Sequence, residues 1–67
     1  MRKVSIGENI KKIREDKGIK QSELAECVGI TKSMMSQIER GSKVPSMPLG
    51  ADIARELECS MDDFVRG

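Results

Sequence analysis

Apolar residues in this chain recur every three or four positions, which is the period of an amphipathic helix. The first such run predicts a helix over about residues 5–17 and is formed by Ile6, Ile10 and Ile13. Ser5 followed three residues later by Glu8 has the form of a capping box, which marks a helix start. Lys17 and Gly18 end the run, so we expect one helix before the first turn.

The middle of the chain predicts two short helices, over residues 21–28 and 32–40, joined by a tight turn. Gly29 ends the first, because glycine adopts a positive φ at little cost. Thr31 is placed to cap the second, and Gly41 to close it. The apolar residues that face inward from the two segments are Leu24, Ala25, Val28, Ile30, Met35 and Ile38.

The last third of the chain predicts a helix over about residues 46–57 and a single helical turn over 60–65. Ser46 caps the longer helix, and Gly50 inside it is expected to cost about 1 kcal/mol relative to alanine. The apolar residues of this part are Ile53, Ala54, Leu57, Cys59 and Phe64. We expect Cys59 and Phe64 to close the bottom of the core.

No stretch alternates for long with the period of two that strands require, so the fold class is all-α. We expect a compact bundle of five short helices that fills one domain over residues 1–67. A chain of this length buries a small core, which makes a homodimer plausible. No apolar run approaches the ~20 residues of a membrane span, and the N-terminus lacks the apolar part of a signal peptide. We therefore expect a cytoplasmic protein with no membrane partner.

The formal net charge is only +1, but the charge is unevenly distributed. Residues 1–43 hold ten basic and six acidic side chains, whereas residues 44–67 hold two basic and five acidic ones. The first segment thus carries a net charge of +4 and the second −3. This polarity suits a module that presents one face to phosphates.

The composition offers little for catalysis or metal binding. The chain has no histidine and two cysteines, Cys27 and Cys59, whereas a structural zinc site needs about four Cys or His ligands. No glycine-rich phosphate loop, nucleophile elbow or carboxylate constellation occurs. We expect no enzyme activity, no metal and no cofactor.

The helix predicted over residues 32–40 carries a polar ridge on its outer side. The members of the ridge are Lys32, Ser33, Ser36, Gln37 and Arg40. A helix with hydrogen-bonding tips, held by a second helix across a short turn, is the helix-turn-helix arrangement that enters a DNA major groove. Met34 lies at the edge of this helix, where packing is favoured over a contact with a thymine methyl group.

In the order and spacing of these residues, the chain resembles the DNA-binding domain of the phage repressor/Cro family, also called the xenobiotic-response-element helix-turn-helix family. The resemblance runs from Ile6 to Phe64. The residues that carry it are Gln21, Leu24, Ala25, Gly29, Ile30, Thr31, Ser36, Ile38, Glu39, Gly41, Pro45, Ser46, Ile53, Ala54 and Leu57.

The resemblance implies roles for individual residues. Base contacts are implied for Lys32, Ser33, Ser36 and Gln37, with Lys32 suited to guanine and Gln37 to adenine. Contacts with the DNA backbone are implied for Lys20, Gln21, Thr31, Arg40 and Lys43. An ion pair between Arg14 and Glu39 is implied to join the first and third helices.

The sequence departs from the family pattern at a few positions. Lys20 stands where a serine or threonine cap is usual, and lysine has no hydrogen-bond acceptor to offer there. Met34 and Met35 replace the usual threonine and isoleucine. Gly50 occupies a position where a large apolar residue is common, which puts the packing of that helix in question.

These observations favour a sequence-specific regulator of transcription that binds double-stranded DNA as a homodimer at an inverted repeat. The alternative is a protein-interaction module of the same fold, of the antitoxin or antirepressor type, that docks a partner through its acidic end. Steep dependence of DNA binding on salt distinguishes the first from the second.

Overall fold

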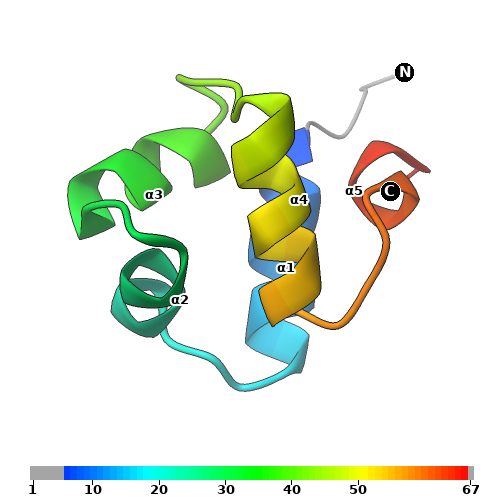
Figure 1. Cartoon of the computed structure of the whole chain (residues 1–67), viewed down its shortest axis with the longest axis horizontal. Helices are drawn as coiled ribbons and strands as arrows, with labels where there is room; N and C mark the ends of the chain where they lie inside the picture. The colour runs from blue at the N-terminus through cyan, green and yellow to red at the C-terminus, as the bar shows by residue number, and fades with distance from the viewer. Residues whose placement is uncertain (1–5, 67) are drawn as a thin grey trace.

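The computed structural model describes residues 6–66, and in this part of the chain every element is a helix (Figure 1). The five helices are α1 (Ile6–Asp16), α2 (Gln21–Val28), α3 (Lys32–Glu39), α4 (Met47–Glu56) and α5 (Asp62–Arg66). The prediction of an all-α bundle of five short helices is confirmed. Predicted and observed ends differ by no more than two residues, and α2 has the predicted bounds.

Local sequence explains where the helices begin. Thr31 Oγ1 accepts a hydrogen bond from Met34 N at 3.1 Å, and Ser46 Oγ accepts one from Leu49 N at 3.3 Å, as expected of helix caps. Lys20 provides no such bond from its side chain, as predicted. Instead its backbone N–H donates to Glu23 Oε1 at 3.0 Å, which is one half of a capping box.

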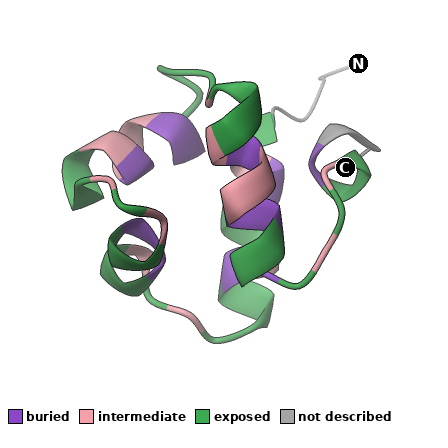
Figure 2. Ribbon diagram, viewed as in Figure 1, coloured by how far each residue is buried: buried purple, intermediate pink, exposed green. Residues whose placement is uncertain are grey.

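The core lies between the inner faces of all five helices (Figure 2). α3 packs against α1 and α2, α4 packs against α2, and α5 packs against α1. The buried apolar residues are Ile10, Leu24, Ala25, Met35, Ile38, Ile53, Ala54, Leu57 and Phe64. Each helix of the helix-turn-helix unit therefore packs against a helix outside the unit: α3 against α1, and α2 against α4.

The buried face of α1 differs from the prediction. Ile6, expected in the apolar stripe, is 37% exposed because it stands at the very start of the helix. Asn9 is buried in its place, and its side-chain amide donates to the carbonyl oxygen of Phe64, which joins α1 to α5. The predicted cap at Ser5 lies outside the described residues.

α1 approaches α3 at a point where only glycine fits. A Cβ atom on Gly7 would lie 1.8 Å from the carbonyl oxygen of Ile38 and 3.1 Å from the Cα atom of Glu39. These are backbone atoms of the last turn of α3, and no rotamer change can move them away. Gly7 is thus required for the close packing of α1 on the end of α3.

Gly50 does not interrupt α4, although it stands where a large side chain was expected. The helix continues from Met47 to Glu56, and Gly50 is buried. The methyl carbon of Met61 lies 3.0 Å from the place that a Cβ atom of Gly50 would occupy. A flexible methionine from the α4–α5 connection fills the space, which answers the question about packing.

The end of α4 carries a strained residue. Cys59 N donates to Ala54 O at 3.0 Å and Glu58 N donates to Arg55 O at 3.1 Å, the hydrogen bonds of a Schellman motif. The residue at the left-handed position of this motif is usually glycine, but here it is Glu58, with a φ of 55°. A left-handed conformation costs an L-residue roughly 1–2 kcal/mol.

We expect Glu58→Gly to stabilise the protein by about 0.5–1 kcal/mol, since the relieved strain is partly offset by the larger entropy of glycine in the unfolded chain. Urea unfolding followed by circular dichroism measures the change. Arg55→Gly is the control, because the same new residue at a right-handed helical position in the last turn of α4 is expected to cost roughly 0.5–1 kcal/mol. Equal losses in both variants would contradict the strain at Glu58.

Candidate nucleic-acid interface

The turn between α2 and α3 is built by three residues, 29–31. Gly29 has a φ of 80°, and the N–H of the next residue, Ile30, donates to Ala25 O at 2.9 Å. This left-handed termination reverses the chain at once, and Thr31 then starts α3 in an extended conformation. The predicted end of α2 at Gly29 and the predicted cap at Thr31 are both confirmed.

α3 has a buried side and an outer side. Met35 and Ile38 are fully buried and Glu39 is nearly so, whereas Met34 is half-buried and packs against the core. The outer side is formed by the residues predicted for it. Lys32, Ser33 and Arg40 are exposed, and Ser36 and Gln37 are half-buried. The structure therefore presents a polar helix surface, and the polar ends of its side chains are free to make hydrogen bonds.

Arg14 of α1 and Glu39 of α3 form the expected ion pair, and it is buried. Arg14 Nε donates to Glu39 Oε2 at 2.8 Å and Nη2 donates to Oε1 at 3.1 Å, while the side chains are 9% and 2% exposed. Arg14 Nη1 also donates to Ile19 O at 2.7 Å. The hydrogen bonds with Glu39 raise the pKa of Arg14 above its ordinary value. The pair holds the end of α3 against α1 and the α1–α2 connection.

Gln21 belongs to the same network, which was not foreseen from the sequence. Its amide nitrogen Nε2 donates to Glu39 Oε1 at 3.0 Å, from the first residue of α2. Sequence alone gives no signal for this contact, because a glutamine at a helix start fits a phosphate contact equally well. The first residue of α2 is consequently tied by its side chain to the last residue of α3.

The other residues with implied contacts to the DNA backbone are exposed. They are Lys20, Thr31, Arg40 and Lys43. Thr31 has two roles open to it, since its oxygen accepts the capping bond from Met34 N while its hydroxyl hydrogen stays available for donation. These residues stand just before α2, at the start of α3, at the end of α3 and in the following loop. Thr31, Arg40 and Lys43 thus flank α3 along the chain, whereas Lys20 precedes α2.

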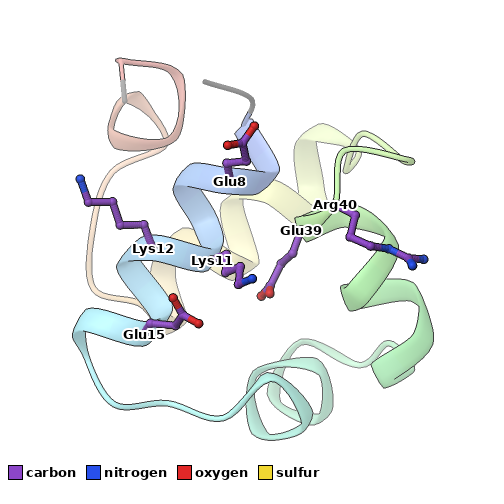
Figure 3. A pocket seen from close by; sticks show the side chains of 6 residues that line it. All are labelled: Glu8, Lys11, Lys12, Glu15, Glu39 and Arg40. Atoms are coloured by element: carbon purple, nitrogen blue, oxygen red, sulfur yellow. The ribbon is translucent and has the colours of Figure 1, made fainter. Parts of the chain in front are cut away.

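A shallow groove lies between α1 and α3 (Figure 3). Figure 3 shows Glu39 reaching from α3 toward α1 across this groove, with Arg40 at its outer side. Its lining comprises Glu8, Lys11, Lys12, Glu15, Glu39 and Arg40. Acids and bases are equal in number, so the groove does not select for an anion or a cation.

The two thiols show no activation. Cys27 is exposed and Cys59 is half-buried, and both are unpaired. Desolvation, together with carboxylates that include Glu56 beside Cys27 and Asp63 beside Cys59, raises the pKa of both thiols. Within residues 6–66 no group of three or more potential ligands is arranged to hold a metal ion. In the same range no helix is long and apolar enough to cross a membrane.

Comparison with known families gives a match to the helix-turn-helix family over residues 10–64. The transcriptional regulator YazB of Bacillus subtilis is 37% identical over 59 residues, which are 88% of this chain and 86% of YazB. The transcriptional regulator SinR of the same organism is 40% identical over 61 residues. This match spans 90% of the chain and 55% of SinR, so the likeness covers about half of that protein.

Solved structures show the same arrangement of helices. The P22 c2 repressor in complex with a synthetic operator superposes with a TM-score of 0.88 at 29% identity, over 97% of this chain and 98% of that one. SinR in complex with DNA superposes with a TM-score of 0.81 at 38% identity, over 88% of this chain and 95% of that one. Both neighbours are regulators solved together with DNA.

Proposed function

Because this chain belongs to the helix-turn-helix family of DNA-binding transcriptional regulators, we propose that it binds an inverted-repeat operator as a homodimer, with α3 in the major groove. The observation that carries the proposal is the division of α3 into two sides. Met35, Ile38 and Glu39 fix the helix to the body, and Lys32 and Ser33 project from its first turn without contributing to the core.

The base contacts come from the outer side of α3. The N-terminal residues of a recognition helix contact base edges in this arrangement, which places Lys32 and Ser33 first. Gln37 and Ser36 follow one turn later on the same side. A lysine pairs with guanine O6 and N7, and a glutamine with adenine N6 and N7. Lys32 and Gln37 therefore set the preferred bases, and the two serines add adaptable hydrogen bonds.

The DNA backbone is held around this surface by Lys20, Thr31, Arg40 and Lys43, together with the start of α2. The side-chain amide of Gln21 already donates to Glu39, so we assign the phosphate contact of Gln21 to its backbone N–H. Free N–H groups and the dipole at a helix N-terminus favour an anion. Glu39 thereby positions the phosphate-binding end of α2 relative to α3.

The dimer follows from the small surface of one module. Two copies related by a two-fold axis double the contacts, and their recognition helices enter successive major grooves about 34 Å apart. The three cations at positions 20, 40 and 43 give six phosphate contacts per dimer, for which the slope of log affinity against log salt is roughly −5.

Selection of bound duplexes from a random pool, followed by titration of the selected duplex against salt, tests the proposal. We expect an inverted-repeat motif and a steep salt slope. Weak binding that is equal for all duplexes would contradict the operator. It would favour the alternative, a protein-interaction module whose partner meets the acidic segment 44–67.

Lys32→Ala and Gln37→Ala are expected to relax specificity, each at one position of every half-site, by about 1–3 kcal/mol of discrimination. Lys20→Ala and Lys43→Ala are the matched controls, because phosphate contacts carry no sequence information. Each control should weaken binding to all duplexes alike and reduce the salt slope by about 0.9 for each lost phosphate contact. Competition with single-base variants of the operator measures both effects. An unchanged base preference in Lys32→Ala would remove that residue from base recognition.

A further inference from the structure

α3 carries three apolar side chains, and only one of them stays partly accessible. Met35 and Ile38 are fully buried, whereas Met34 is half-buried while it packs against the core. The packing expected of Met34 is therefore present but incomplete. Its accessible surface lies in the first turn of α3, next to the exposed polar residues Lys32 and Ser33.

Met34 stands on the border between the two sides of α3. Residues three and four positions apart are neighbours on a helix surface, so Met34 adjoins Gln37 on the outer side and Ile38 on the buried side. Side chains of a helix also lean toward its N-terminus. This direction brings the accessible part of Met34 toward the end of α3 whose residues contact base edges under the proposed function.

An accessible apolar group at this place has one complement in the major groove. Among the four bases only thymine presents a methyl group there, and apolar side chains recognise it by contact. A thioether donates no hydrogen bond and accepts only weakly, so it cannot replace the water on a polar base edge. Methionine is also unbranched and flexible, so its end can adapt to a methyl group while its stem packs on the core.

We propose that Met34 contacts the 5-methyl group of one thymine in each half-site and is a further specificity-determining residue beside Lys32 and Gln37. The inference rests on the proposed function. Lys32 and Gln37 recognise purines through hydrogen bonds, whereas Met34 adds selection for one pyrimidine through its methyl group. Loss of this contact should lower the affinity by about 4-fold in each half-site, which corresponds to one buried group of the size of a methylene.

Replacement of thymine by uracil, one position at a time in the selected duplex, tests the contact because it removes only the methyl group. In the unaltered chain, uracil at one position of a half-site should lower the affinity by about 4-fold. In Met34→Gln, which keeps the length of the side chain but makes its end polar, the same uracil should have no effect. Both duplexes are compared on one protein, so any unfolded fraction of the variant cancels in the ratio of the two affinities.

Two further variants are the controls. Met34→Leu keeps the side chain apolar and should keep most of the uracil effect. Met47→Gln makes the same replacement at an exposed methionine outside α3 and should keep the effect in full. An equal uracil effect in the unaltered chain and in Met34→Gln would overturn the inference, and so would a selected duplex in which no thymine responds to uracil. Failure to select any duplex would instead contradict the proposed function, and the inference with it.

Discussion

Replacing Arg14 by methionine is expected to destabilise the protein by about 3–5 kcal/mol, because it leaves the buried carboxylate of Glu39 without its charged partner. The free energy of unfolding of a domain of this length is roughly 3–10 kcal/mol, so the variant loses a large share of its stability. Gln21 still donates to Glu39, but one neutral donor does not replace a bidentate guanidinium. Urea unfolding followed by circular dichroism measures the loss.

Two further variants establish that the loss comes from the ion pair. Arg14→Met combined with Glu39→Met should be less destabilised than the two single variants together, since a buried pair is replaced by apolar side chains. Arg55→Ala removes an exposed pair with Asp52, whose closest atoms are 3.7 Å apart, and should cost less than about 1 kcal/mol. A loss below about 1 kcal/mol in Arg14→Met would contradict the buried pair.

Gly7→Ala is expected to cost about 3 kcal/mol or more, at the upper end of overpacking effects. The added methyl group would lie 1.8 Å from Ile38 O, and the contact can be relieved only by moving α1 away from α3. That movement also stretches the bonds between Arg14 and Glu39. The midpoint temperature of thermal unfolding and the affinity for the selected operator should therefore both decrease.

Gly50→Ala is the matched control for Gly7→Ala. It places the same methyl group in another buried helical glycine, but the nearest atom is the flexible end of Met61 at 3.0 Å. The better helix propensity of alanine, about 1 kcal/mol, offsets the movement of Met61. We expect the free energy of unfolding to change by less than about 1 kcal/mol in either direction. Equal losses at Gly7 and Gly50 would contradict the distinction.

Much of the fold follows from local sequence. The spacing of Leu24, Ala25, Met35 and Ile38 predicts the faces that the structure buries, because helical periodicity alone places them together. The caps at Thr31 and Ser46 and the break at Gly29 are also local, since they depend on neighbouring backbone groups. For this reason the bounds of α2 and the turn after it agree with the prediction.

The structure differs from the prediction where contacts between helices determine which residues are buried and how they pack. Asn9 is a polar residue that no pattern marks as buried, and only the approach of α5 supplies its acceptor, Phe64 O. Nothing in the sequence indicates that Gly7 lies against the carbonyl oxygen of Ile38. Gly50 put the packing of α4 in question, and the space beside it is filled by Met61, eleven positions later.

At the candidate interface, too, the features set by local sequence were predicted and a feature set by contacts between helices was not. The outer side of α3 follows from helical spacing, and the pairing of Arg14 with Glu39 follows from the family resemblance. The hydrogen bond from Gln21 to Glu39 could not be predicted. A glutamine amide can donate equally well to a carboxylate or to a DNA phosphate, so the sequence does not choose between the two. The contacts with bases and phosphates stay predictions until a bound duplex is identified.

The fixed and free parts of α3 occupy separate positions along one short helix. Lys32 and Ser33 contribute nothing to the core, whereas Met35, Ile38 and Glu39 hold the helix in place. Under the proposed function, substitutions at the first two positions would therefore change the preferred operator without lowering the stability of the fold. If the proposed function holds, duplicated copies of such a gene would acquire new operators through one or two substitutions, which would make this scaffold readily evolvable.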